Sequence, residues 1–369
     1  MQRRAFLQRV LCMAASAGMW PQRGHSAEYA YAPVVAGTTL QFPRDHGAHL
    51  EHRIEWWYLT GWLDRSSAAD TPPCGFQVTF FRVRTPLPAG VSRFTPTQLL
   101  FAHAAVSDPR VGHILHDERA ARAGFGLAQA AVGDTDVLIR DWRLQREPSG
   151  AYRATIRAQD FALQLDAVPA QAVLLQGHEG YSRKGPLQEH ASYYYSVPQL
   201  RVSGSIVVRG RKEAVTGRAW LDHEWSSTLM PPQAAGWDWL GLNLDDGGAI
   251  MAFRMRSIDA TAPPVWADAR IRNANGLLSA VDRRTIAFAP ERHWTSPQGG
   301  RYPVQTRITV GAQILHVRPL FDAQEITSHS MGNTYWEGAV TAYAGGGPGA
   351  RRLGRGYWEL TGYRKPQRL

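Results

Sequence analysis

Short segments rich in β-branched and aromatic residues recur about every ten to fifteen residues along most of the chain. Helix signals are scarce, and 35 Gly and 23 Pro supply many turns. This spacing is typical of β-sandwiches and β-barrels, so the sequence predicts an all-β fold. The expected strands are 55–63, 75–85, 99–106, 136–145, a hairpin over 152–168, 192–197, 199–209, 214–221, 238–245, 249–258, 265–273, 284–289, 306–310, 314–317, 335–343 and 356–363.

The strand pattern stops after Trp225, and residues 226–236 form a loop that contains Met230-Pro231-Pro232. Segment 55–62 resembles segment 356–363, since both contain Trp, then Leu-Thr-Gly, then an aromatic residue. The repeat fits two related barrels of roughly 160–180 residues. We therefore predict one domain over 28–215 and a second over 216–369.

Residues 1–27 are predicted to be a targeting signal rather than part of the fold. Arginines without acids are followed by an apolar stretch and by Ser26-Ala27, as in secretory signals. The opening Arg3-Arg4-Ala5-Phe6-Leu7 resembles a twin-arginine export signal, and the alternative is an ordinary secretory signal. We expect a periplasmic or secreted protein.

The mature chain would have few means of stabilisation besides its core. Without residues 1–27 it retains 37 basic and 31 acidic residues, scattered rather than clustered, so a nucleic-acid partner is not expected. Cys74 would be the only remaining cysteine, which excludes an intramolecular disulfide and a cysteine zinc site.

The most promising catalytic cluster is Asp222-His223-Glu224, which ends a strand beside the predicted domain junction. A histidine beside carboxylates suits proton transfer, with His223 as general acid or base and Asp222 or Glu224 orienting it. The alternative is that both carboxylates only hold the loop. Metalloprotease, nucleophile-elbow, dinucleotide and P-loop motifs are absent from the sequence. Segment 180–185 reads as a polar turn.

Histidines over 45–52 could ligate zinc, but their spacing matches no general metal motif, and we expect neither a metal nor a cofactor. Aromatic residues concentrate in four clusters, at 56–58, 193–195, 237–239 and 335–336. Such rings offer an apolar wall with polar groups for a hydrophobic ligand, and the alternative is core packing. The predicted ligand-binding residues are Trp57, Tyr58, Tyr194, Trp225, Trp237, Trp239, His49 and Glu55.

Several of these segments together resemble the secreted branch of the AttH-like and carotenoid 1,2-hydratase family. The resemblance runs over nearly the whole mature chain. It is carried by 45–46, 55–61, 75–82, 176–185, 193–196, 215–225, 236–239, 335–338 and 359–363. It implies two lipocalin-like, calycin-type antiparallel β-barrels packed together.

The resemblance also implies a long hydrophobic ligand, such as a lipid, isoprenoid or polyene, held in a barrel or between the barrels. Secreted members often accompany ABC-type export systems, and they are called predicted secreted hydrolases. His223 and Trp225 match the family's Asp-His-x-Trp segment, whereas 249–253 lacks the Tyr and Asp of the hydratases.

Three functions follow from these observations. The first is an exported binding protein for a hydrophobic molecule, serving an ABC-type export system. The second is a hydratase, isomerase or hydrolase that acts on such a ligand through His223. The third is a structural partner of a membrane complex.

Overall fold

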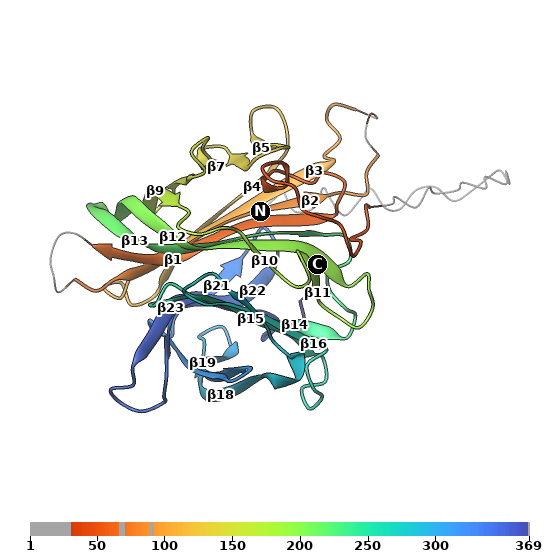
Figure 1. Cartoon of the computed structure of the whole chain (residues 1–369). Helices are drawn as coiled ribbons and strands as arrows, with labels where there is room; N and C mark the ends of the chain where they lie inside the picture. The colour runs from red at the N-terminus through yellow and green to blue at the C-terminus, as the bar shows by residue number, and fades with distance from the viewer. Residues whose placement is uncertain (1–30, 66–70, 89, 91, 368–369) are drawn as a thin grey trace. The chain divides into compact units, whose positions relative to one another are not determined.

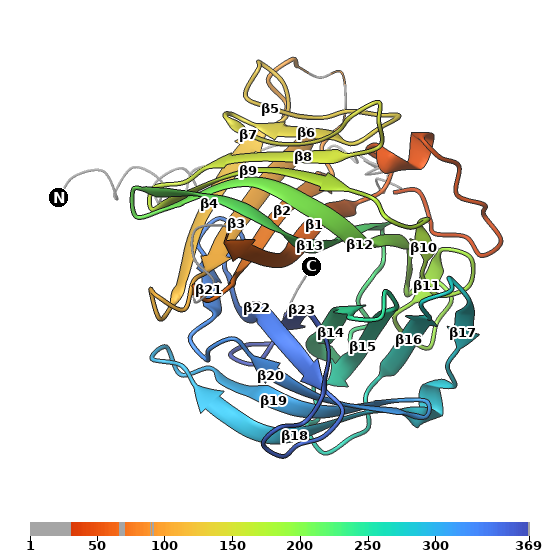
Figure 2. The same ribbon diagram turned by 60° about the vertical axis from the view of Figure 1, so that its left-hand side comes forward.

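The computed structural model describes residues 31–65, 71–88, 90 and 92–367, so the predicted signal at 1–27 lies outside the described residues. The described chain forms two antiparallel sheets (Figures 1 and 2). The first contains β1 (Ile54–Arg65), β2 (Cys74–Arg84), β3 (Gln98–Ser107), β4 (Ile114–Arg122), β5 (Ala128–Ala130), β6 (Asp136–Ile139), β7 (Trp142–Arg146), β8 (Tyr152–Arg157), β9 (Phe161–Val168), β10 (Leu174–Leu175), β11 (Tyr181–Arg183), β12 (Ala191–Val208) and β13 (Arg211–Ser226).

The second sheet contains β14 (Ala234–Leu244), β15 (Ala249–Ser257), β16 (Trp266–Arg272), β17 (Leu278–Ala280), β18 (Ile286–Thr295), β19 (Arg301–Val310), β20 (Gln313–Pro319), β21 (Glu325–Ser328), β22 (Asn333–Tyr343) and β23 (Arg352–Leu360). Two 3-10 turns, η1 (Arg44–His46) and η2 (Arg283–Thr285), accompany the strands. The first sheet curls until β4 contacts β6, forming a nearly closed barrel, and in the second β16 contacts β18. The predicted all-β, lipocalin-like class is therefore confirmed.

The strand predictions differ from the structure mainly where charge or a turn interrupts the pattern. Segment 136–145 is a tight hairpin, β6 and β7, because Arg140 takes a positive φ of 56° between them. Segments 192–197 and 199–209 form one long strand, β12, whose register shifts between Val197 and Leu200. β4 was not predicted, since its sequence is rich in charged residues and alanine.

The chain passes from the first sheet to the second between Ser226 and Ala234, within the predicted loop. The predicted domain boundary at 215/216 falls inside β13, which pairs with β1 and β12 in the first sheet. Both sheets are organised around a central aromatic strand. β1 lies between β2 and β13, and β23 lies between β14 and β22.

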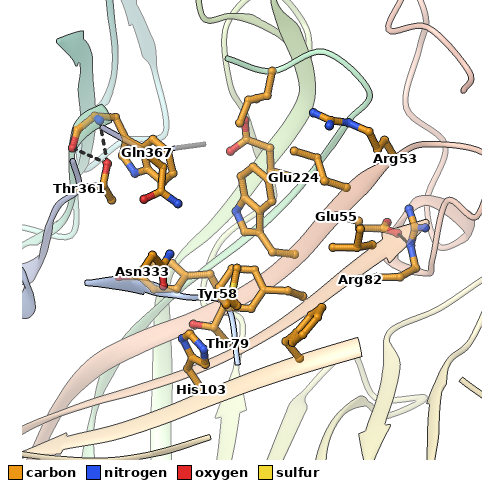
Figure 3. Close-up of a pocket in the computed structure, with 18 of the residues that line it drawn as sticks. Arg53, Glu55, Tyr58, Thr79, Arg82, His103, Glu224, Asn333, Thr361 and Gln367 are labelled. Atoms are coloured by element: carbon orange, nitrogen blue, oxygen red, sulfur yellow. Dashed lines mark hydrogen bonds and ion pairs between the residues drawn. The ribbon is translucent and has the colours of Figure 1, made fainter. Parts of the chain in front are cut away.

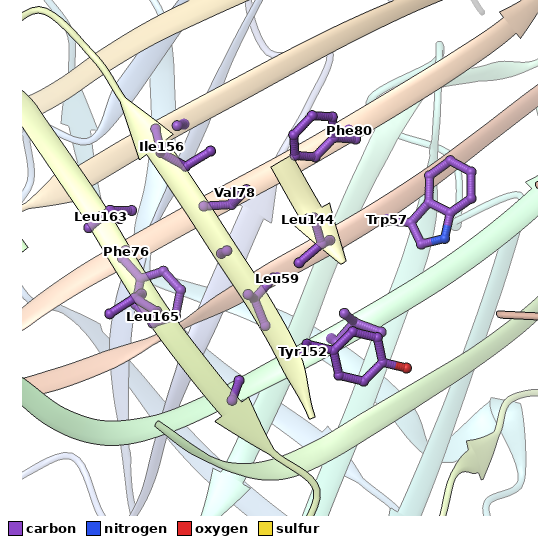
Figure 4. Close-up of a cluster of buried hydrophobic side chains, with 14 of the residues drawn as sticks. Trp57, Leu59, Phe76, Val78, Phe80, Leu144, Tyr152, Ile156, Leu163 and Leu165 are labelled. Atoms are coloured by element: carbon purple, nitrogen blue, oxygen red, sulfur yellow. The ribbon is translucent and has the colours of Figure 1, made fainter. Parts of the chain in front are cut away.

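Each sheet buries one face in a core of its own. The first core contains Trp57 and Leu59 of β1 together with rings and aliphatic chains from β2 and from β7 to β9 (Figure 4). The second contains Trp358 and Leu360 of β23. The repeated Trp-x-Leu pattern therefore points into a core in both sheets, because alternate residues of a strand share a face.

The opposite faces of β1 and β23 turn toward each other. Trp62 Nε1 of β1 donates to the carbonyl oxygen of Gly356 in β23 at 3.0 Å. Gly75 of β2 lies where a Cβ atom would come within 2.5 Å of Ala339 Cβ and 2.8 Å of the Tyr357 hydroxyl. Only glycine permits this approach of the two sheets. A search of the described residues finds no helix long and apolar enough to cross a bilayer.

Candidate functional site

A cavity of about 520 Å³ lies between the two facing sheet surfaces (Figure 3). Its walls are mainly aromatic and aliphatic, and a small number of carboxyl, hydroxyl and imidazole groups interrupt them. The volume falls within the range of small-molecule pockets, roughly 300–1,000 Å³. Lining side chains include Trp56, Tyr58, Thr79, Phe81, Val83, Leu99, Phe101, His103, Asp222, Glu224, Trp237, Trp239, Phe253, Met255, Tyr335, Glu337 and Glu359.

The lining follows from strand alternation. From the first sheet, alternate residues of β1, β2, β3 and β13 face outward from the barrel and into the cavity. From the second sheet, alternate residues of β14, β15 and β22 meet them, with Glu359 of β23. The intervening residues, such as Trp57, Leu240, Trp336 and Trp358, fill the two cores. The cavity is therefore lined by the face of each sheet that does not pack into that sheet's own core.

The structure separates the predicted site residues. Tyr58, Asp222 and Glu224 of the first sheet and Trp237 and Trp239 of the second line the cavity. Glu55 also borders the cavity, but it shares the barrel face of β1 with Trp57. Tyr194 lies behind the wall, where its hydroxyl donates to Asp222 at 2.8 Å and accepts from Trp239 Nε1 at 3.0 Å. Trp57, His223 and Trp225 are buried on the barrel side, and the ring of His49 stacks on Trp225 at 3.7 Å.

The sequence predicted that Asp222 or Glu224 orients His223, but the structure does not place either beside its ring. Asp222 and Glu224 point to the cavity face, because neighbouring residues of a strand point in opposite directions. The partner of His223 Nε2 is Glu55 Oε1, at 2.9 Å. His223 Nδ1 lies 3.1 Å from the carbonyl oxygen of Asp45 and 3.1 Å from the Tyr195 hydroxyl. Burial lowers the pKa of His223, although Glu55 opposes this effect.

Glu55 is the centre of a buried polar network. Arg82 Nε donates to Glu55 Oε2 at 2.7 Å, and both side chains are fully buried. His49 Nδ1 lies 2.8 Å from Glu55 Oε1. Burial raises the pKa of Glu55, but Arg82 and the two histidines outweigh that effect and hold it well below its usual range.

His49, Glu55 and His223 offer three atoms that could hold a metal ion, all within 4.8 Å of one another. The other carboxylate oxygen of Glu55 is already bound to Arg82. A guanidinium in this position opposes the charge of a divalent cation, so we do not assign a metal site here.

Asp222 and Glu224 differ in their surroundings, although both face the cavity. Asp222 accepts hydrogen bonds from Tyr194, Ser196 and Trp220. Burial nevertheless raises the pKa of Asp222 to about 7, and the nearby Glu224 adds to this effect. A carboxyl group in this state holds a proton near neutral pH.

Glu224 instead lies beside a buried cation. Its Oε1 lies 3.0 Å from Lys184 Nζ, and Ser192 donates to it. Lys184 Nζ donates to Ser182 Oγ at 2.9 Å. Segment 180–185 was predicted to be a polar turn, but Tyr181–Arg183 form β11, and Ser182 and Lys184 are both buried.

Two carboxyl groups of the cavity, Glu337 and Glu359, were not predicted from the sequence. They are register partners on the neighbouring strands β22 and β23. Glu337 is 2% exposed. Burial, together with the adjacent Glu359, raises the pKa of Glu337 well above its ordinary value. Their signal in the sequence was an acid beside a tryptophan in each of two strands.

The model of the AttH-like family matches residues 33–363. The chain belongs to the AttH-like family. Its fold is also similar to the crystal structure of an AttH protein from Nitrosomonas europaea, at 48% identity and a TM-score of 0.82. That match covers 90% of this chain and 99% of the other. The predicted resemblance to AttH-like proteins is confirmed.

Kievitone hydratase from Nectria haematococca shares the fold at 15% identity and a TM-score of 0.66. The match covers 92% of this chain and 97% of that enzyme. A search of curated proteins finds no significant match.

Proposed function

We propose that this AttH-like protein binds an apolar small molecule in the cavity between its two sheets. The observation that carries the proposal is the cavity itself, about 520 Å³ with largely aromatic and aliphatic walls. A pocket of this size and composition buries most of a ligand's apolar surface, while few polar groups fix its orientation.

Filling the cavity is expected to weaken binding without unfolding the chain. Val83 of β2 lines the cavity and is only partly buried, so Val83→Trp places a large ring in the ligand's space. A steric cost of about 1–3 kcal/mol corresponds to a loss of affinity of about fivefold to 150-fold. Binding is measured with anthracene as an apolar fluorescent probe.

The matched control is Val132→Trp, at a position that is 66% exposed and outside the cavity lining. It should bind anthracene as the unchanged chain does. Equal binding by the Val83→Trp variant would place the ligand elsewhere. Native mass spectrometry of the protein from its own periplasm, with organic extraction, would then identify the natural ligand.

A second candidate is an enzyme acting on the same ligand. The observation that favours it is the pair of buried carboxyl groups, Glu337 and Glu359, in the cavity wall. His223, the acid or base predicted from the sequence, is not among the lining residues and reaches the cavity only through Glu55. We therefore place the acid chemistry of this candidate on the second sheet.

We also propose that the protein is exported through its twin-arginine-type signal and serves an ABC-type export system. Arg3 and Arg4 carry the first part of this proposal. Changing both to lysine is expected to remove the protein from the periplasmic fraction while the cytoplasmic fraction retains it. Unchanged export would indicate an ordinary secretory signal.

A further inference from the structure

The two carboxyl groups of the second sheet face the same side of the cavity. Glu337 of β22 and Glu359 of β23 are directly opposed in the antiparallel register. Side chains in such a pair have Cβ atoms about 4.5–5.5 Å apart. Trp237 Nε1 donates to Glu359 Oε2 at 2.9 Å, and among the described residues no ion pair to either carboxyl group is found. Two carboxyl groups are thus brought together without a neutralising cation.

The buried hydroxyl of Tyr58 lies beside this pair. It faces the carboxyl group of Glu337, and the interaction between the two side chains affects the pKa of each. Both residues also line the cavity, so a polar atom of a bound molecule can reach them there.

Protonation removes the repulsion between the two carboxyl groups. Burial is the main cause that raises the pKa of both groups. Glu359 further raises the pKa of Glu337, and Glu224 further raises the pKa of Glu359. The other titratable groups of the cavity are Asp222 and Glu224 on β13, Lys184 directly after β11, Glu55 and Tyr58 on β1, Arg53 directly before β1, Arg82 and Arg84 on β2, His103 on β3, Tyr335 on β22, and Tyr31. Lys184 is bound to Glu224, and Arg82 to Glu55.

We propose that the Glu337–Glu359 pair is a proton-donating site, which transfers a proton to a basic atom of the apolar ligand in the cavity. The proposal rests on the proposed function, because it requires a ligand there. In this step the carboxyl O–H bond breaks and a bond from the hydrogen to the acceptor atom forms. The electron pair stays on the carboxylate, so an ion pair between ligand and protein results.

The surrounding rings favour the product of this transfer. Trp237, Trp239 and Tyr58 line the same cavity, and their faces can stabilise a cation by about 0.5–2 kcal/mol. The negative charge left on one carboxyl group is stabilised by the cation, and the Trp237 indole N–H continues to donate to Glu359. Proton transfer thus leaves a carboxylate beside a cation, which is an attractive arrangement.

Acridine tests the proposal, because it is an apolar weak base whose emission changes when its ring nitrogen is protonated. Anthracene has the same shape without the nitrogen. We expect the unchanged protein to bind both, and bound acridine to emit as acridinium at a slightly alkaline pH where free acridine is neutral. Glu337→Gln and Glu359→Gln, which imitate the protonated acid, should hold bound acridine in its neutral form, whereas Val132→Trp, outside the cavity, should still give acridinium emission.

The outcomes separate the two proposals. If neither probe binds, the proposed function fails. If anthracene binds and acridine binds only in its neutral form, the function stands and the proton-donating site is wrong. If both Gln variants still protonate acridine and Asp222→Asn does not, the donor is Asp222 and the assignment to the pair is overturned. Thermal unfolding of each variant shows whether it is folded. If only one of the two Gln variants folds, that variant alone tests the proposal.

Discussion

Replacing Glu55 by alanine is expected to lower the free energy of unfolding by about 3–5 kcal/mol. The change removes the carboxylate that pairs with the fully buried Arg82 and that bonds His223. The guanidinium then remains in the interior without a counter-charge, held only by neutral acceptors such as Gln98 Oε1, which compensate its desolvation less well. Denaturation by urea near neutral pH measures the loss.

A surface ion pair is the control for this effect. Asp245 pairs with Arg352 at 2.8 Å, and both side chains are nearly half exposed. Asp245→Ala should cost no more than about 1 kcal/mol, because solvent screens such pairs. A Glu55 variant as stable as the Asp245 variant would show that Arg82 finds another partner or is not buried in solution.

The stability of the chain is also expected to depend on pH through Asp222. The folded state holds a proton on Asp222 up to a pKa of about 7, whereas the unfolded chain releases it near pH 4. The contribution of this group is therefore fully present below pH 4 and is lost as pH rises toward 7. Three pKa units correspond to roughly 4 kcal/mol.

The measurement is the difference between the unchanged chain and Asp222→Asn, which imitates the protonated acid. Burial lowers the pKa values of His46, His52 and His103, and these groups contribute a slope of the opposite sign between about pH 3 and 6.5. These histidine contributions are the same in both proteins, so they cancel in the difference between the two unfolding free energies. The variant should gain stability relative to the unchanged chain from pH 4 to 8, and a flat difference would show that Asp222 titrates normally.

The sequence predicted the class of fold because turns and β-branched runs are local signals. It could not predict which way residues of β13 point. Residues 219–226 are all buried, so the usual contrast between an apolar and a solvated face is missing. Asp222, His223 and Glu224 therefore looked like one cluster, although the strand places the histidine on the opposite face from the two acids.

The same argument explains the missed carboxyl pair. Glu337 and Glu359 belong to motifs that the sequence analysis had noticed for their aromatic residues. That they oppose each other depends on the pairing of β22 with β23. Register between strands is set by packing of the whole sheet rather than by a local pattern. Glu55 was predicted as a ligand contact, but its bond to His223 required the pairing of β1 with β13.

The late pairing of the central strands affects how the protein can be synthesised. Ile54 of β1 has Ser226 as its partner in β13, and Asp238 of β14 has Leu360 as its partner in β23. While the ribosome is still adding residues, β1 offers an unpaired aromatic edge, which invites aggregation. Closing such long chain segments is slow, and the cavity is complete only after β23 has emerged. A chaperone that covers β1 during translation would therefore raise the yield of folded protein.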